Sequence, residues 1–124
     1  MTPLEVSYEH VSDGATVISV SGHVTVYSAP LLRAVLVDLT HQGCVRLVVD
    51  LSLAGFLDST GLGVILGGLK RCRAQGGGLV LVITEERVGK ILRVTGLVKV
   101  FPTFTTVSRA IEELARLERS VEPT

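Results

Sequence analysis

The chain has 124 residues, with twelve basic and twelve acidic side chains, so its formal net charge is zero when the histidines are neutral. This length is close to the usual size of one domain and needs no disulfide or metal to hold a core together. The charge balance argues against a nucleic-acid binder, which normally carries a basic excess on one face. Hydrophobic residues make up 47% of the chain and charged residues 19%, which is typical of a globular domain and excludes disorder.

Sequence signals for a membrane span, a signal peptide or a metal site bear on the compartment and cofactors of the protein. No apolar run approaches the roughly 18 residues of a membrane-spanning helix, and the first ten residues lack the basic and apolar regions of a signal peptide. Cys44 and Cys72 stand apart, with neither CxxC spacing nor an adjacent histidine. We therefore expect reduced thiols in a cytoplasmic protein, with no membrane partner, no metal and no other cofactor.

The N-terminal part of the chain predicts a β-hairpin. Residues 4–8 alternate between apolar and polar side chains, and residues 16–21 form a second run of strand character. The turn signal Asp13-Gly14 lies between the two runs. Gly22 then interrupts the pattern, and we expect residues 23–27 to form a short extended or loop segment.

A helix and a central strand are expected next. Ser28 lies where an N-cap belongs, Pro30 falls in the first turn, and Gly43 ends the helix. Residues 46–51 form a β-branched run that is typical of a strand buried on both faces. We expect residues 52–57 to form a loop.

The C-terminal half alternates helices and strands. The expected elements are a helix over 59–75, a buried strand over 79–83, a helix from Glu85 to Gly96, an edge strand over 100–104 that Pro102 breaks, and an amphipathic helix over 107–117.

The complete order, ββαβαβαβα, predicts an α/β fold. Alternation after the hairpin implies a mixed sheet, in which the later strands are parallel and joined by helical crossovers. We expect one domain over residues 1–119 and a frayed tail over residues 120–124.

One segment is the best candidate for a functional site. Asp58 and Ser59 place a carboxylate and a hydroxyl where a helix begins after a buried strand. Glycines are unusually dense in this helix, at positions 61, 63, 67 and 68. Each interior glycine costs about 1 kcal/mol relative to alanine, so their presence suggests that something must approach closely there.

Two interpretations of this segment need no modification of the chain. In the first, Asp58 or Ser59 caps the helix and the glycines let it press against the sheet. In the second, Gly61 and Gly63 belong to a dinucleotide-binding turn, but the third glycine of that fingerprint falls at Leu66.

Two further interpretations assign chemistry to Ser59. A nucleophilic serine in an elbow would need glycine at Leu57, and no histidine has an evident acidic partner. Covalent regulation is the alternative, because N–H groups at a helix N-terminus can hold a phosphate. A phosphate adds a charge of about −1.5 to −2, which would repel a partner fitted to an apolar, glycine-lined surface.

The run FLDSTGLGVILG over residues 56–67 closely resembles the signature of bacterial anti-sigma factor antagonists, which are single STAS domains. The resemblance continues in residues 27–32, 47–51 and 91–102, so it spans nearly the whole chain. It implies a mixed sheet packed with helices and no catalysis by this chain.

The resemblance also implies a set of partners. Members of the family bind an anti-sigma factor that is also a serine kinase, and so free a sigma factor for transcription. The kinase uses its own ATP to phosphorylate the serine that matches Ser59, which breaks the complex. A separate PP2C-type phosphatase then resets the switch.

Site residues carry over from the resemblance by position. Ser59 is the expected phosphoacceptor. The expected partner-binding residues are His23, Thr25, Tyr27, Asp58, Thr60, Gly61, Leu62 and Gly63.

One departure from the family pattern lies in the turn before the first helix. Relatives usually read Gly-Glu-x-Asp there, whereas this chain reads Gly22-His23-Val24-Thr25. Two interpretations of this departure stay open. The loss of both acids changes the affinity for the kinase, the rate of phosphorylation or the kinase that is recognised, or it is neutral drift in a surface turn. Two other hypotheses stay open: a STAS scaffold that is never phosphorylated, and a nucleotide-binding protein that uses the Gly61 region.

Overall fold

The computed structural model describes residues 2–11 and 14–120, with side chains as far as residue 116. Its elements are β1 (Glu5–His10), β2 (Thr16–Val24), α1 (Ala29–His41), β3 (Arg46–Leu57), α2 (Ser59–Ala74), β4 (Gly78–Val82), α3 (Glu86–Thr95), the 3-10 helix η2 (Leu97–Lys99), β5 (Thr103–Phe104) and α4 (Val107–Ser120). This order confirms the predicted α/β fold. Asp13 of the predicted turn and residues 121–124 of the predicted tail lie outside the described residues, and α4 includes Ser120.

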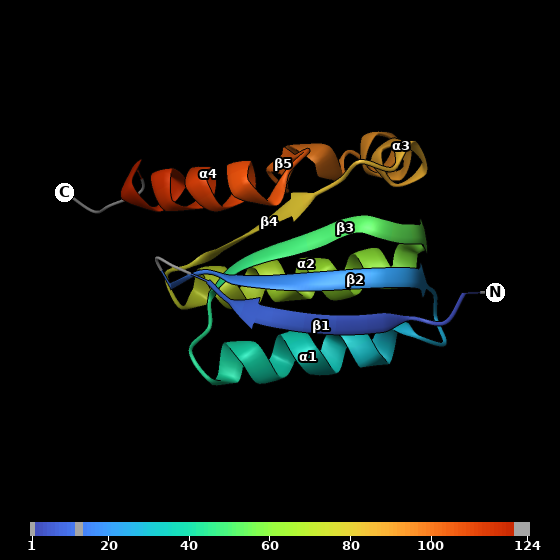
Figure 1. Cartoon of the computed structure of the whole chain (residues 1–124), viewed down its shortest axis with the longest axis horizontal. Coiled ribbons are helices and arrows are strands. Elements are labelled where there is room, and N and C mark those ends of the chain that lie inside the picture. The colour runs from blue at the N-terminus through green and yellow to red at the C-terminus, as the bar shows by residue number, and fades with distance from the viewer. Residues whose placement is uncertain (1, 12–13, 121–124) are drawn as a thin grey trace.

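A single mixed sheet organises the domain (Figure 1). Its strands lie in the order β1-β2-β3-β4-β5. The β1–β2 pair is antiparallel and the other three pairs are parallel, as the hairpin and the crossover pattern predict. The carboxyl ends of β2, β3 and β4 therefore meet at one end of the sheet, where parallel α/β folds usually place their functional residues.

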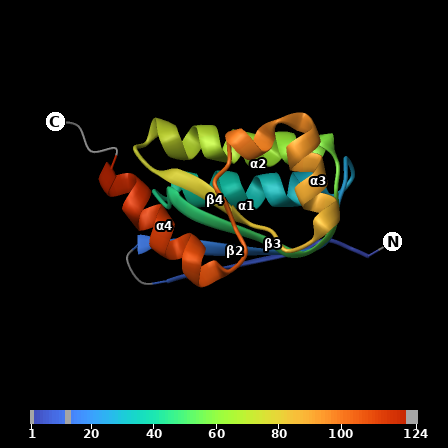
Figure 2. The same ribbon diagram turned by 90° about the horizontal axis from the view of Figure 1, so that it is seen from above.

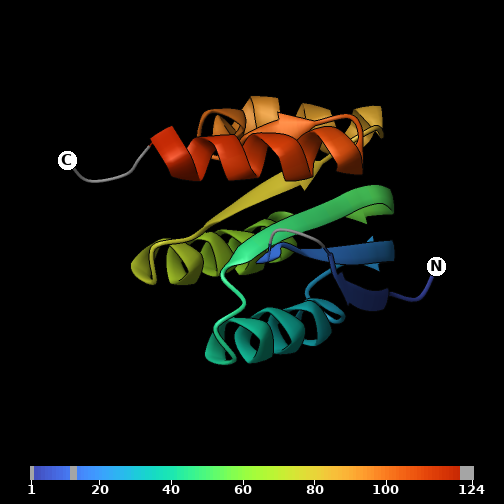
Figure 3. The same ribbon diagram turned by 60° about the vertical axis from the view of Figure 1, so that its left-hand side comes forward.

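Helices cover both faces of the sheet. Figure 2 shows α1 and α2 on one side and α4 on the other, and Figure 3 shows α1 beside β1 and β2 while α4 lies beside β4 and β5. The larger core lies under α1, α2 and α3, and includes Leu47 and Val49 of β3. Val48 points to the smaller core under α4. The prediction of a central strand buried on both faces is thus confirmed.

The expected loop over residues 52–57 is wrong, because β3 continues through that segment to Leu57. Two register shifts in its pairing with β2 explain the misleading pattern. Relative to β2, β3 has one extra residue between Asp50 and Leu53, and Gly55 is a second extra residue. Such bulges break the apolar–polar alternation that identifies a strand, and they leave Leu53 74% exposed. For the same reason β2 runs past Gly22 to Val24, two residues into the expected loop.

The last strand is shorter than predicted. Gly96 ends α3 in the left-handed conformation, as expected, and residues 97–99 form η2. Residues 100–102 of the predicted strand do not belong to β5. Only residues 103–104 pair with β4, although the Pro102 carbonyl already accepts a hydrogen bond from the Leu81 N–H at 3.0 Å. The predicted edge position is confirmed.

The two cysteines are free thiols, as expected. Cys72 is buried in the larger core, and burial raises the pKa of its thiol to about 11. Cys44 is half-buried.

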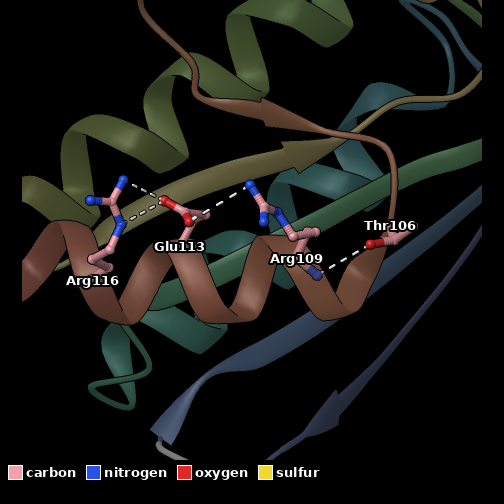
Figure 4. A network of polar contacts seen from close by, with 4 residues as sticks. All are labelled: Thr106, Arg109, Glu113 and Arg116. Atoms are coloured by element: carbon pink, nitrogen blue, oxygen red, sulfur yellow. Dashed lines mark hydrogen bonds and ion pairs between the residues drawn. The ribbon is translucent and has the colours of Figure 1, made fainter.

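The surface of α4 carries a small network of polar contacts (Figure 4). The Thr106 hydroxyl accepts a hydrogen bond from the Arg109 N–H at 3.2 Å, which caps the helix. Glu113 lies 2.8 Å from Arg116 and 3.9 Å from Arg109, and the hydrogen bond from Arg116 lowers the pKa of its carboxyl group. Exposed ion pairs of this kind contribute little to stability.

Candidate functional site

The candidate site forms where β3 ends and α2 begins (Figure 1). Asp58 has extended backbone there and caps α2, its Oδ1 accepting a hydrogen bond from the Gly61 N–H at 2.9 Å. Its Oδ2 accepts a second hydrogen bond, from the Val26 N–H at 3.0 Å, and its own N–H donates to the Val24 carbonyl at 3.1 Å. One carboxylate therefore joins the start of α2 to the β2–α1 loop (residues 25–28), 32 positions away along the chain.

The β2–α1 loop is held by its own polar side chains. Ser28 occupies the predicted N-cap position of α1, but its hydroxyl makes no capping bond, because the residue has helical rather than extended backbone. Instead its Oγ accepts a hydrogen bond from the Thr25 N–H at 2.9 Å and donates to the His23 carbonyl at 2.8 Å. The Thr25 Oγ1 accepts from the Tyr27 N–H at 3.2 Å. The loop is therefore a fixed surface that presents Tyr27 outward.

Ser59 is the first residue of α2 and is exposed. Its hydroxyl makes no hydrogen bond within the described part of the chain. The N–H groups of Gly61 and Leu62 both bond Asp58, at 2.9 and 3.0 Å. Within the same described residues, the N–H groups of Ser59 and Thr60 have no partner. An accessible hydroxyl thus lies beside free N–H groups and the positive end of a helix dipole, an arrangement suited to holding a phosphate.

The glycines of α2 divide between its two faces. A Cβ on Gly61 would lie 2.6 Å from Leu57 Cδ1 and 2.7 Å from Val24 Cγ1, so this glycine lets the helix pack on the sheet. A Cβ on Gly68 would meet Leu36 and Leu79 at 3.2 and 3.3 Å. Close internal packing therefore accounts for one pair of glycines.

The other two glycines face outward. Nothing lies within 4 Å of a Cβ placed on Gly63, and a Cβ on Gly67 would meet only the Arg71 guanidinium, at 3.4 Å. Packing inside the chain thus gives no reason for glycine at either position. Their effect is to leave a smooth strip along the solvent side of α2.

The predicted partner-binding residues lie around this end of the sheet at different depths. Tyr27 is 89% exposed and Thr60 is also exposed, whereas Thr25 and Asp58 are half-buried. His23 is half-buried, with its ring edge-on to Phe56 at a centroid distance of 6.1 Å.

Two predicted site residues lie below the surface. Gly61 is buried, and Leu62 is only 4% exposed within the larger core. These two residues therefore lie in the layer beneath the exposed site residues.

Sequence reasoning missed three apolar residues near the site. Val26 is 55% exposed and is the residue that bonds Asp58, Leu31 is 48% exposed in the first turn of α1, and Phe56 is 39% exposed at the end of β3. No periodic pattern marks these three residues as exposed, since Val26 lies in a loop, Leu31 in a helix and Phe56 beyond a bulge. Together with Tyr27 they give this end of the molecule an apolar surface.

Neither a membrane helix nor a metal centre is present in the described ranges. No helix there is long and apolar enough to cross a membrane. No group of three or more potential ligands among its His, Cys, Asp and Glu residues could hold a metal ion.

Known proteins are similar to this chain in sequence and in fold. The model of the STAS domain family matches residues 9–110. The anti-sigma-B factor antagonist of Bacillus subtilis (strain 168) is 42% identical over 80 residues, which cover 64% of this chain and 72% of that protein. The anti-sigma F factor antagonist of Paenibacillus polymyxa is 29% identical over 112 residues, covering 90% of this chain and 95% of the relative. The crystal structure of an anti-sigma factor antagonist from Mycobacterium paratuberculosis superposes with a TM-score of 0.82 at 28% identity, covering 90% and 94% of the two chains.

Proposed function

This chain belongs to the STAS domain family and, within it, to the anti-sigma factor antagonists, and we propose that it binds an anti-sigma factor and so frees a sigma factor. The observation that carries the proposal is the exposed Ser59, at the junction of the apolar β2–α1 loop with the smooth strip of α2. An exposed apolar surface around a few fixed polar groups is typical of a protein–protein interface.

Phosphorylation of Ser59 switches this binding off in our proposal. The anti-sigma factor is also the kinase, and transfers the γ-phosphoryl group of ATP to the Ser59 oxygen, with release of ADP and of the hydroxyl proton. The helix N-terminus accommodates the phosphate, so the domain itself stays folded. The added charge instead acts on the partner.

One phosphate changes the local charge strongly, because few charged residues lie near Ser59 in the sequence. Between Phe56 and Leu69 the sole charged residue is Asp58. A phosphate on Ser59 adds a charge of about −1.5 to −2 next to it. A partner that fits the uncharged surface must then desolvate this group, and a thousandfold loss of affinity requires only about 4 kcal/mol.

The remaining parts of the cycle follow from the same proposal. A PP2C-type phosphatase hydrolyses the phosphoserine and restores binding. The chain itself is a regulator without catalysis, acts in the cytoplasm where sigma factors act, and needs neither nucleic acid nor a membrane as partner.

The turn that departs from the family pattern influences the choice of kinase. His23 and Thr25 stand where relatives usually carry acidic residues. His23 lies near the end of β2, and Thr25 begins the β2–α1 loop, which Asp58 joins to the start of α2. A kinase adapted to this chain therefore meets one carboxylate near the acceptor, at Asp58, instead of three. This departure also favours the second candidate function, a STAS scaffold that is never phosphorylated.

Nucleotide binding is disfavoured by the geometry. In a phosphate-binding turn the N–H groups at the helix start hold the ligand. Here the Asp58 carboxylate already accepts from the N–H of Gly61, the first glycine of that fingerprint, and the third glycine is replaced by Leu66.

Phosphorylation by the cognate kinase tests the proposal. The purified chain is incubated with the kinase and ATP, and the product is digested and mapped by mass spectrometry. We expect one phosphate, on Ser59, and none in Ser59→Ala, whereas Thr60→Ala should still be modified. A phosphate elsewhere contradicts the switch, and partner binding without any phosphate supports the scaffold.

A further inference from the structure

Gly22 is a point of unusually close approach outside α2. Its φ of +95° lies in the region that favours glycine, and it stands beside the second register shift between β2 and β3. A Cβ there would lie 2.1 Å from the Pro3 carbonyl oxygen and 2.9 Å from the Pro3 carbonyl carbon. Both the backbone conformation and the space therefore require glycine, and the second requirement comes from the N-terminal segment (residues 2–4).

The N-terminal segment is bound to the end of β2. The Thr2 carbonyl accepts a hydrogen bond from the His23 N–H at 3.2 Å. Leu4 packs against the larger core at the start of β1. The segment is thus anchored on one side by apolar packing, and it bonds β2 two residues beyond the end of the β1–β2 ladder at Ser21.

A continuous set of hydrogen bonds leads from this contact to the candidate site. The His23 carbonyl accepts from the Ser28 hydroxyl, which in turn accepts from the Thr25 N–H. The next N–H along the loop, that of Val26, donates to Asp58. The segment therefore holds the residue from which the β2–α1 loop starts, and the loop ends on the carboxylate that caps α2.

We propose that the N-terminal segment is a positioning element for the partner-binding surface, which fixes the β2–α1 loop through Gly22 and His23. Without it, the bonds of the loop still exist, but the strand end that carries them is held on one side only, by β3. The Val26–Asp58 bond then opens more often, and Tyr27 loses its fixed place on the loop that Asp58 joins to α2. This inference rests on the proposed function only for the identity of the partner that the surface binds.

Hydrogen exchange of the full chain tests the positioning role without any partner. The variant is Gly22→Ala, and the controls are Gly43→Ala and Gly76→Ala, which have φ of +84° and +83° but nothing within 4 Å of the new Cβ. All three variants place alanine at a positive φ, and only the first displaces Pro3. We expect the Val26 amide to exchange about tenfold faster in Gly22→Ala than in either control.

The central strand provides an internal reference. A merely structural effect of Gly22→Ala would accelerate Val49, in the middle of the sheet, together with Val26. Acceleration of Val26 alone supports the positioning role, and equal rates in the variant and both controls overturn it.

Deletion of Thr2 and Pro3 is the second arm, and it covers the case in which Gly22→Ala does not fold. The shortened chain keeps Gly22, and its Val26 amide should again exchange about tenfold faster than in the intact chain. Unchanged Val26 exchange in the deletion overturns the proposal. That failure would leave the kinase assay on Ser59 untouched, so the two results are separable.

Discussion

The two faces of α2 use the same residue type for different purposes. Gly61 and Gly68 face the sheet and α1, where a methyl group would meet core side chains at 2.6 to 3.3 Å. Gly63 faces open space, and Gly67 faces only the guanidinium group of Arg71. Each glycine lowers the stability of the helix by about 1 kcal/mol relative to alanine. Only the inner pair offsets this loss by closer packing within the chain.

The inner face of α2 therefore contributes to folding, and the outer face is available for binding a partner. Substitutions on the inner face should change stability through packing. Substitutions on the outer face should raise stability through helix propensity, and any loss they cause must appear in the binding of a partner. Neighbouring positions on α2 can therefore be predicted to respond in opposite directions.

Gly61→Ala should have the largest effect on stability. The new methyl group overlaps Leu57 and Val24, both fully buried, and overpacking of this kind costs about 1–3 kcal/mol. Urea denaturation measures the change, with Gly68→Ala as a matched control whose methyl meets its neighbours only at 3.2 Å or more. We expect the control to lie near the wild-type free energy of unfolding. Similar values for both variants would contradict the inner-face geometry.

Asp58→Ala should be next in size. It removes the cap of α2 and the bond to the Val26 N–H, and together these losses should lower the free energy of unfolding by about 1–2 kcal/mol. Asp58→Asn retains an oxygen for the cap and should recover part of the loss in the same denaturation experiment. An Ala variant as stable as wild type would show that the junction between the loop and α2 does not depend on this side chain.

Gly63→Ala should act in the opposite direction. Alanine improves helix propensity, so the free energy of unfolding should rise by about 0.5–1 kcal/mol. A partner whose backbone lies on the smooth strip would meet the new methyl group, and we expect roughly tenfold weaker binding to the anti-sigma factor by calorimetry. Greater stability with unchanged affinity would remove the outer face of α2 from the interface.

The thiols give the smallest expected effect and check the inner face directly. Cys72 lies on that face, and burial raises the pKa of its thiol to about 11, so little thiolate exists near neutral pH. Iodoacetamide followed by mass spectrometry should modify half-buried Cys44 first and leave Cys72 unmodified until the protein unfolds. Equal labelling of the folded protein would show that the inner face opens readily.

Much of the fold was predictable because its signals are local. The β-branched run of β3, the helical spacing in α2 and the left-handed Gly96 each act within a few residues. The end of β3 was not predictable, because its bulges depend on pairing with β2, and they expose Leu53 where alternation would bury it.

The position of the site was predictable from the sequence, but the long-range contacts that hold it together were not. Asp58 and Ser59 stand out in the sequence as a carboxylate and a hydroxyl at a helix start. The second bond of Asp58, to Val26, joins segments 32 residues apart, and the close approach of Pro3 to Gly22 joins the segment before β1 to the end of β2. Neither leaves a periodic pattern in the sequence.

The affinity of this chain for its anti-sigma factor, before and after phosphorylation, is the most direct test of a charge-based switch at the α2 N-terminus. Calorimetry would compare Ser59→Ala, Ser59→Asp and the stoichiometrically phosphorylated wild type. We predict that Ser59→Ala binds like the unmodified protein, that Ser59→Asp binds more weakly, and that the phosphoprotein binds about a thousandfold more weakly. Equal affinities for all of them would contradict the switch.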